Sequence, residues 1–313
     1  MSIIKTLSRA LKQEKERFTI PRSVQDAIPV RRVWPDGIFQ SGSLYSKSFS
    51  FTDINYSIAG KEDKTAMFLD YSELLNALDS GAFAKITINN RRIDKAEFEK
   101  DLLLPEKGDG LDHFRKEYNE MLLSKVTGVS SSVVQDRYIT VSVVKKNINE
   151  ARAYFSRVGT SIITHLAQLS SVGRELELQD RLRIFRDFFK GGEPAAFDFN
   201  LKENMRLGHS FKDWLCPDSM EFHKDCFRLN DRWGRALYLQ GYASYLKDAM
   251  ISELCDLDRS LMLSIDILPV PTDEAVREVQ NKLLGVETNA TNWQRRQNAA
   301  NNFSAVLPYD MEQ

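Results

Sequence analysis

The chain has 313 residues, of which 42% are hydrophobic and 28% charged, the balance of a globular protein with a packed core rather than of a disordered or fibrous one. Its 43 Lys and Arg residues and 44 Asp and Glu residues give a net charge of −1. This near-neutral total excludes a cationic surface over the whole protein of the kind that binds DNA or RNA.

The sequence predicts neither a membrane-spanning helix nor a signal peptide. The longest stretch without a charged residue, 158–173, has 16 residues, whereas a spanning helix needs roughly 20 mostly apolar ones. The N-terminus lacks the continuous apolar segment of a signal peptide. The three cysteines, Cys216, Cys226 and Cys255, form no C-x-x-C pair. We therefore expect a protein of the reducing cytoplasm.

The N-terminus is basic. Residues 1–17 are predicted to form a short amphipathic helix, because their apolar side chains share one face. Residues 1–32 contain eight Lys or Arg and three acidic residues, a net charge of +5. Two interpretations are open. The segment contacts an anionic membrane surface or a partner protein, or it is a solvated helix that begins the domain. The candidate contact residues are Lys5, Arg9, Lys12, Lys15 and Arg17.

The following elements are predicted from periodicity and turn residues. The first group consists of a hairpin at 37–51 with its turn at Ser41–Ser43, a helix at 64–78, a strand around 86–88, helices at about 94–103 and 110–125, and a strand at 136–144. Asn147, with Glu150 three residues later, predicts a capped helix that ends near Leu169. A further helix is expected at about 176–189, before Gly191 and Gly192.

A second group of elements follows an irregular stretch at 191–217. It consists of paired strands at 222–229 and 236–242, a helix at 247–257, a strand at 261–267, and a helix that is capped by Thr272 and ends near Leu284. The order hairpin, helix, strand, helix thus occurs twice. No closing strand is visible in the second unit, and the tail from Thr288 is rich in asparagine.

We therefore predict an α+β fold of two related hairpin–helix–strand–helix lobes with ferredoxin-like layering, the second incomplete at the C-terminus. The expected parts are a basic N-terminal helix and linker (1–32), a first lobe (33–190), a linker (191–217) and a second, truncated lobe (218–313). The chain is expected to be the front part of a longer protein.

No catalytic or cofactor-binding motif is visible. A phosphate-binding loop needs G-x-x-x-x-G-K-[ST], but Asn55 and Glu62 stand at the two ends of that pattern around Gly60-Lys61. Gly108-x-Gly110 has His113 where a dinucleotide-binding loop would have its third glycine. A G-x-S-x-G nucleophile elbow is also missing. No catalytic or cofactor-binding residue is predicted.

The sequence predicts neither a metal site nor a nucleic-acid-binding site. Cys216, His223 and Cys226 lie close in sequence, near Asp218 and Asp225, but a zinc site would require tighter cysteine spacing and a fourth ligand, so no metal site is predicted. Direct binding of nucleic acid is not expected, because strand aromatics usually belong to a core and no RNP-like run exists. The residues considered were the basic doublets 31–32, 91–92, 145–146 and 295–296 and the aromatic residues Tyr138, Phe227 and Tyr238.

Several short stretches resemble one family. They are Phe51–Tyr56, Lys61–Phe68, Ser252–Asp258, Leu263–Ile267, Asn292–Asn298 and Pro308–Glu312. Together and in this order they resemble the N-terminal region of the VirB/TrbE/CagE-type conjugal-transfer ATPases, above all the TraE-like members of conjugative elements of Gram-positive bacteria. None of the stretches is a catalytic motif.

The resemblance implies the N-terminal docking platform of a type IV secretion motor. Such a region contacts small membrane proteins of the channel, self-associates in the full-length protein, and lies in the cytoplasm at the inner face of the membrane. In the family, ATP and Mg²⁺ bind a later RecA-like domain with Walker motifs. This sequence stops before any Walker A motif, so we expect no ATP hydrolysis by this chain alone. The alternative is a stand-alone nucleic-acid-binding or regulatory module.

Overall fold

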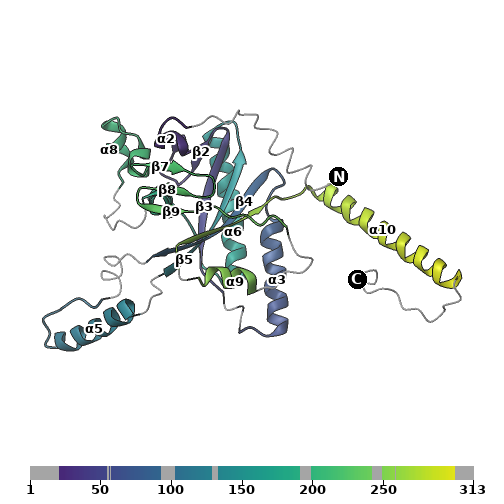
Figure 1. Ribbon diagram of the computed structural model, residues 1–313, viewed down its shortest axis with the longest axis horizontal. Helices are drawn as coiled ribbons and strands as arrows, with labels where there is room; N and C mark the ends of the chain where they lie inside the picture. The colour runs from purple at the N-terminus through teal and green to yellow at the C-terminus, as the bar shows by residue number, and fades with distance from the viewer. Residues whose placement is uncertain are drawn as a thin grey trace. The chain divides into compact units, whose positions relative to one another are not determined.

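The structure is a computed structural model, and it describes residues 21–54, 56, 58–92, 103–128, 133–190, 199–241, 249–257 and 259–299 (Figure 1). These residues belong to two compact units, one within Ile20–Pro269 and the other from Val270 onward. The predicted basic helix 1–17, residues 94–102 of the predicted helix at 94–103, and residues 191–198 of the irregular stretch 191–217 lie outside the described residues. The bounds of the four predicted parts stay a prediction.

The first unit combines helices with two antiparallel sheets, which confirms the α+β class. Its helical elements are α2 (Val24–Ala27), α3 (Lys61–Asn76), α5 (Asp112–Gly128), α6 (Ile148–Gln168), α7 (Leu178–Phe189), α8 (Leu201–Arg206), the 3-10 helix η1 (Phe211–Trp214) and α9 (Ala249–Cys255). Its strands are β1 (Arg32–Val33), β2 (Phe39–Ser41), β3 (Leu44–Phe51), β4 (Ala82–Arg92), β5 (Val133–Val144), β6 (Gly173–Glu175), β7 (Met220–Phe222), β8 (Phe227–Leu229), β9 (Arg232–Gly234) and β10 (Leu261–Ile267).

The central sheet has seven strands in the order β1-β2-β3-β5-β4-β10, with β6 paired to β3. The two long strands β4 and β5 pair over their whole common length, from Ala82 opposite Val143 to Arg92 opposite Val133. β10 pairs with β4, from Leu261 opposite Asn90 to Ile267 opposite Ala84. The predicted strand at 261–267 therefore has the correct bounds and joins the sheet of the first group of elements.

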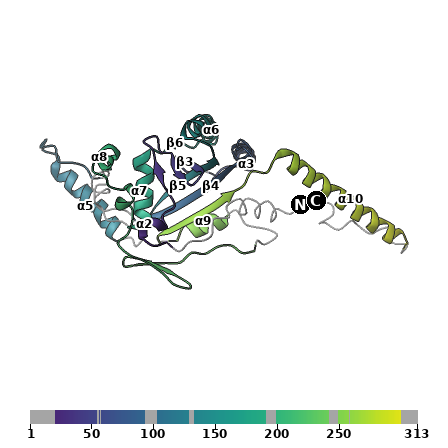
Figure 2. The same cartoon turned by 90° about the horizontal axis from the view of Figure 1, so that it is seen from above.

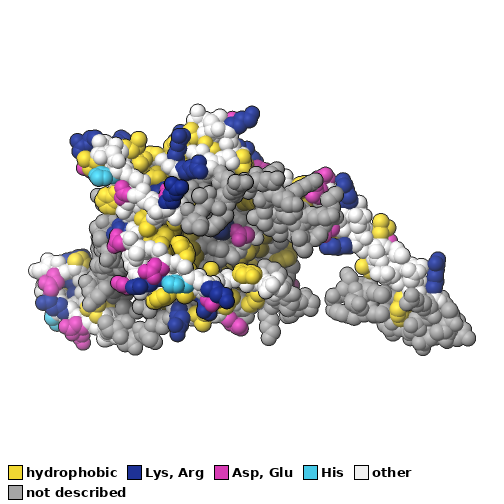
Figure 3. All heavy atoms as spheres, turned by 45° about the horizontal axis from the view of Figure 1, so that its top comes forward, with side chains coloured by type: hydrophobic (Ala, Val, Ile, Leu, Met, Phe, Trp, Pro, Cys, Tyr) yellow, Lys and Arg dark blue, Asp and Glu magenta, His cyan; other side chains and the backbone are white. Residues whose placement is uncertain are grey.

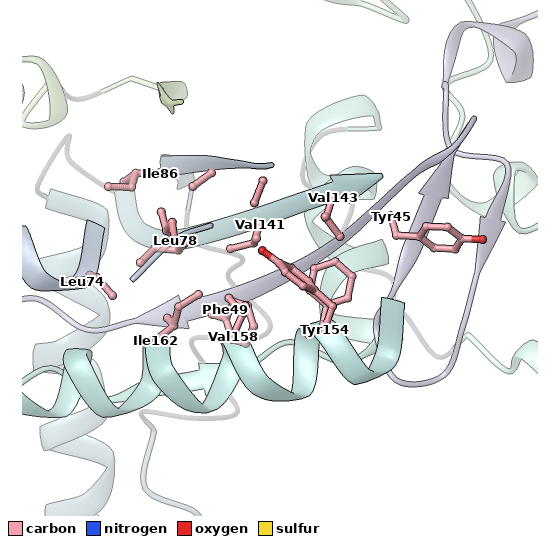
Figure 4. Packing of buried hydrophobic residues seen from close by; sticks show 14 of the residues in the cluster. Tyr45, Phe49, Leu74, Leu78, Ile86, Val141, Val143, Tyr154, Val158 and Ile162 are labelled. Atoms are coloured by element: carbon pink, nitrogen blue, oxygen red, sulfur yellow. The ribbon is translucent and has the colours of Figure 1, made fainter. Parts of the chain in front are cut away.

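One face of the central sheet is apolar because strand side chains alternate between faces. Ile86 of β4 lies opposite Ile139 of β5, and Phe49 of β3 belongs to the same buried cluster. Helices α3 and α6 lie side by side against this face (Figures 1 and 2). From α6, Tyr154, Val158 and Ile162 point toward the strands (Figure 4). The alternation of apolar residues thus places the main core between the sheet and these two helices.

The opposite face of the sheet carries small polar side chains. Ser48 of β3 and Thr140 of β5 are directly opposite each other, and their hydroxyl groups are 2.8 Å apart. Thr87 of β4 and Ser264 of β10 form a further cross-strand pair on this face. The two faces therefore differ as expected for an antiparallel sheet whose main core lies on one side.

The start of α6 confirms the predicted cap. The side chain of Asn147 accepts a hydrogen bond of 3.0 Å from the backbone N–H of Glu150, as N-cap residues do. The helix ends at Gln168, one residue before the predicted end. The hairpin also has the predicted turn, because Ser41 pairs with Leu44 and Gly42 adopts a φ of +61°.

A second, smaller core lies where α7 meets β2. It contains Phe39, Leu178, Leu182, Phe199 and Leu215. Between this core and the sheet, the guanidinium group of Arg181 donates to the carbonyl oxygens of Gly37 (2.8 Å) and Ser46 (2.7 Å) and lies 4.0 Å from the centre of the Phe39 ring. Burial lowers the pKa of Arg181 to about 9, so the group keeps its charge at neutral pH.

The prediction of paired strands at 222–229 and 236–242 is wrong. The structure has three short strands instead, and β8 pairs with β7 and β9. Residues 236–241 form no strand, and Leu237 and Tyr238 are exposed by 85% and 83%. The alternation of apolar residues at 236–242 resembled a strand, but a strand needs a partner, and the turn at Asn230 and Asp231 brings Arg232–Gly234 to β8 instead.

The second unit is described as a single helix, α10 (Thr272–Ala299). It continues well beyond the predicted end near Leu284, because Gly285 is followed by further helix-compatible residues rather than by a terminating signal. Thr272 is the first residue of the helix rather than its cap, and the carbonyl of Pro271 accepts from Ala275. Four exposed apolar residues follow each other at spacings of three and four: Val276, Val279, Leu283 and Val286.

Substitution of Gly37, with Gly42 as the matched control, tests the close contact between the hairpin and the chain that enters α7. Gly37 has a φ of +74°, and a Cβ there would lie 2.1 Å from the carbonyl oxygen of Leu176, whereas Gly42 has a φ of +61° and open space around it. Both alanine variants suffer the backbone strain of about 1–2 kcal/mol. We expect Gly37→Ala to lower the free energy of unfolding by about 3 kcal/mol or more, because backbone atoms must also move.

Chemical denaturation of both variants measures this difference. Equal losses for Gly37→Ala and Gly42→Ala would contradict the close approach of Gly37 to the chain that enters α7.

Candidate partner-binding site

Helix α5 lies in the connection between the two longest strands, β4 and β5. The sequence predicted a helix at 110–125, and the structure confirms it with bounds of Asp112–Gly128. Its polar contacts are local. The side-chain amide of Asn119 donates to the carbonyl of Leu104 and its oxygen accepts from the N–H of Leu104, both at 2.9 Å. The helix is thereby fixed to the loop that precedes it.

Carboxylates fix the first turn of α5. The side chain of Asp112 accepts hydrogen bonds from the backbone N–H groups of Lys107 (3.0 Å) and Gly108 (2.9 Å). Arg115 forms ion pairs with both Asp109 and Asp112. A negative charge at the N-terminus of a helix is also stabilised by the helix dipole. The loop 104–111 and the helix therefore form one locally stabilised segment.

These contacts shift the ionisation of the two acids. The hydrogen bond from Arg115 lowers the pKa of Asp109 to about 2. For Asp112, the hydrogen bond from the N–H of Lys107 and then that from Arg115 lower the pKa below its ordinary value. Both carboxylates are therefore charged at neutral pH and serve as structural anchors rather than as proton donors.

The outward face of α5 is apolar. Leu111, Phe114, Tyr118 and Met121 are exposed by 53%, 58%, 47% and 41%. Their spacing of three, four and three residues places them along one side of the helix. We call these four residues the α5 stripe. An exposed row of apolar and aromatic side chains is typical of a site that binds another protein, because such residues supply most of the energy in protein interfaces.

Sequence reasoning missed this site. The sequence predicts the helix, and its apolar residues at i, i+3, i+7 and i+10 from Leu111 form a visible stripe, but this pattern alone indicates no function. A stripe of this kind usually indicates a face that is buried within the same chain. Only the structure shows that these side chains are exposed.

The residues predicted to contact a membrane or partner, Lys5, Arg9, Lys12, Lys15 and Arg17, lie outside the described residues. The α5 stripe is therefore an independent candidate. Among the described helices, none combines the length and apolar character that crossing a bilayer requires.

The cysteines and histidine considered as metal ligands have other surroundings. Cys216 is buried and Cys226 half-buried, and burial raises the pKa of the Cys216 thiol. The imidazole of His223 lies 3.6 Å from the Glu221 carboxylate and 5.4 Å from the Trp233 ring centre. Within the described part of the chain, no three His, Cys, Asp or Glu side chains are placed to hold a metal ion.

Some of the residues named as candidates for nucleic-acid contact form contacts within the fold instead. Arg91 forms an ion pair of 2.6 Å with Asp136, and burial raises the pKa of Tyr138. Lys145 lies 4.8 Å from the centre of the Tyr154 ring. On the face of the molecule shown in Figure 3, basic and acidic side chains are interspersed, so no field of a single sign appears there.

A scan of the sequence against models of protein families and a search of curated proteins find no match. The proposed function therefore depends on the geometry of α5 and on the short stretches of sequence named above.

Acid should release the first turn of α5. We expect a carbon-13 NMR titration to give Asp109 a pKa of about 2, and Arg115→Gln to raise it toward the ordinary value of about 3.9. Because the folded pKa is lower than the unfolded one, this stabilisation is complete above about pH 4 and is lost as the pH falls toward 2. Amide exchange at Leu111, whose N–H donates to the Asp109 carboxylate, should accelerate over the same range.

An Asp109 that titrates near 4 in the unchanged chain would contradict the ion pair with Arg115. A pKa that Arg115→Gln leaves at about 2 would do so as well.

Proposed function

We propose that this chain is an interaction module: the N-terminal docking platform of a conjugative type IV secretion motor of the VirB/TrbE/CagE type. In this proposal it holds small membrane proteins of the secretion channel at the inner face of the cell membrane. The single observation that supports a docking role most strongly is the α5 stripe. The short stretches that resemble the family support its assignment to a secretion motor.

Some of the stretches that carry the resemblance contribute to the described fold. Ile54 and Met67 pack against the main core, and Leu263–Ile267 lies within β10. The carbonyl of Cys255 accepts from Asn90 and Gln135, at 2.6 and 2.7 Å, and so fixes the end of α9 to β4 and β5. Residues with such structural roles suit a platform whose geometry must be maintained.

Ferredoxin-like layering of the central sheet belongs to the same proposal. The predicted second lobe is not a separate sheet, because β10 pairs with β4 in the central sheet and residues 236–241 form no strand. The proposal therefore takes the central sheet as the body of a single platform that precedes a motor domain. ATP and Mg²⁺ would then bind that later domain, and hydrolysis would require it. Self-association would occur in the full-length protein, and the basic residues 1–17 would add attraction to an anionic membrane surface.

The chemistry of the α5 stripe fits an apolar helix of a membrane component. Phe114 and Tyr118 offer large rigid side chains, and Met121 a flexible one that adapts to irregular surfaces. Spacing at i, i+3 and i+7 is the pattern with which one helix contacts another or lies in a groove. The partner would therefore present a continuous apolar surface, not an acidic or a basic one.

The alternative is a stand-alone nucleic-acid-binding or regulatory module. The observation in its favour is Trp233, exposed by 61%, with the Arg228 guanidinium 5.8 Å from its ring centre. However, Arg228 also forms ion pairs with Glu221 (3.7 Å) and Asp231 (3.4 Å), which reduce its attraction for phosphate. Salt-dependent binding of single-stranded DNA that is lost in Trp233→Ala would favour this alternative.

The coding sequence beyond the codon of Gln313 tests the motor assignment. We expect the reading frame to continue and to encode a strand followed by G-x-x-x-x-G-K-[ST], because the proposal places this chain before a motor domain. A stop codon with no such motif in the neighbouring frames would contradict the motor assignment and leave an interaction module of another kind.

Substitution of the stripe tests the docking assignment. The double variant Phe114→Ser, Tyr118→Ser should reduce the share of the chain in the membrane fraction of its native host about ten-fold, because two central anchors are removed. The matched control is Lys116→Ser, Glu120→Ser, which changes two exposed residues on the polar side of the same helix. It should leave the distribution unchanged.

Circular dichroism should show both double variants to be folded, since all four side chains are exposed. Equal membrane shares for the two double variants would contradict docking through α5.

A further inference from the structure

Strand β10 forms an edge of the central sheet. It pairs with β4 along its whole length, and among the described residues no strand pairs with its other side. A free edge offers unpaired N–H and C=O groups to another strand, and proteins usually protect it with a bulge, a lysine or a proline. The register with β4 is continuous, and Leu261–Ile267 contains neither Lys nor Pro. As far as the described residues show, this edge is therefore open to pairing.

The two faces of β10 differ in polarity. Leu261, Leu263, Ile265 and Ile267 alternate along the face that continues the apolar side of β4, and Ile267 packs against the main core. This row is incompletely covered, because Ile265 is exposed by 36%. Met262, Ser264 and Asp266 occupy the other face and are exposed. A strand that pairs with this edge should match both rows.

A second β10 matches both rows. Antiparallel pairing of two copies about Ser264 places Leu261 opposite Ile267 and Leu263 opposite Ile265, so that apolar residues lie on the same face of both strands. Met262 then lies opposite Asp266, and Ser264 opposite itself. A shift of the centre to Asp266 would place two aspartates directly opposite each other, which is unfavourable. A shift by half a residue would oppose apolar to polar residues along the whole strand.

We propose that two copies of this chain associate through β10, in antiparallel register about Ser264, so that the central sheet continues across a twofold axis. A symmetric contact requires a surface that is complementary to itself, and the apolar row of β10 has this property. Pairing would satisfy the free backbone groups of the edge and would cover Ile265. The overall charge of −1 adds little repulsion between copies.

Sedimentation of the full chain at several concentrations tests the proposal. We expect a dimer for the unchanged chain and at least a ten-fold increase in its dissociation constant for Ser264→Lys, because two lysines would meet at the twofold axis. The control Asn76→Lys adds the same charge at an exposed position of α3 and should leave the dimer unchanged.

A second variant tests the register. Met262→Lys places a lysine opposite the partner's aspartate at 266 on each side of the axis, so it should retain or strengthen the dimer although it adds a charge to the edge. In a register centred one residue away, this ion pair does not form. Weakening by Met262→Lys equal to that by Ser264→Lys would overturn the register.

Disulfide trapping covers the case in which Ser264→Lys fails to fold. Opposed residues of antiparallel strands have Cβ atoms about 4.5–5.5 Å apart, close to the spacing of a disulfide. We expect Ser264→Cys to form a covalent dimer under mild oxidation, and Asn76→Cys and the unchanged chain, with its half-buried Cys226, to form none. Absence of the Ser264→Cys dimer overturns the proposal.

A chain that is monomeric at all concentrations also overturns it. So does a dimer that persists in folded Ser264→Lys, since the contact then lies elsewhere, for example on the apolar positions of α10. The proposal does not depend on docking through α5. The α5 double variant should remain dimeric, so failure of one claim leaves the other testable.

Discussion

Burial of one face of the central sheet against α3 and α6 is the constraint on which the rest of the structure depends. The apolar rows of β3, β4 and β5 meet Leu74 of α3, Leu78 just after this helix, and the inward side chains of α6 in a single cluster (Figure 4). The opposite face carries polar side chains, of which Ser48, Thr87 and Asn89 are buried. The remaining elements are arranged around this layer, and they leave the edge at β10 and the connection that holds α5 available for contacts.

A second constraint connects this layer to the smaller core. Arg181 brings a positive charge into a buried position, which is costly unless the guanidinium finds acceptors. It finds them in the carbonyls of Gly37 and Ser46, which belong to the start of the hairpin, and in the ring of Phe39. The position of α7 is therefore tied to the hairpin by polar contacts as well as by packing, and Gly37 must be small for the two to approach.

The sequence predicted the elements better than it predicted their partners. Alternation identified β3, β5 and β10, and the Asn147 cap identified the start of α6, because these signals are local. The pairing of β10 with β4 joins residues far apart in the chain, which no local pattern contains. The segment 236–241 alternates like a strand and has no strand partner, so its pattern was misleading. The end of α10 was missed because Gly285, a residue type that often ends a helix, lies inside this one.

The candidate site also shows that a local sequence pattern does not reveal what a side chain faces in the fold. The apolar spacing of Leu111, Phe114, Tyr118 and Met121 can be seen in the sequence, but whether such a stripe faces a core or the solvent depends on the whole fold. The absence of a phosphate-binding loop and of a nucleophile elbow, in contrast, follows directly from the sequence. The exposed apolar side chains of α5 are the observation on which the proposed docking role depends.

Site-specific photocrosslinking in the native host tests the docking role most directly. A photoreactive phenylalanine analogue at position 118, in place of Tyr118, is compared with the same analogue at position 116, in place of Lys116 on the opposite side of α5. The account predicts an adduct with a small membrane protein at position 118 and none at position 116. No adduct at position 118, or equal adducts at both positions, would contradict it.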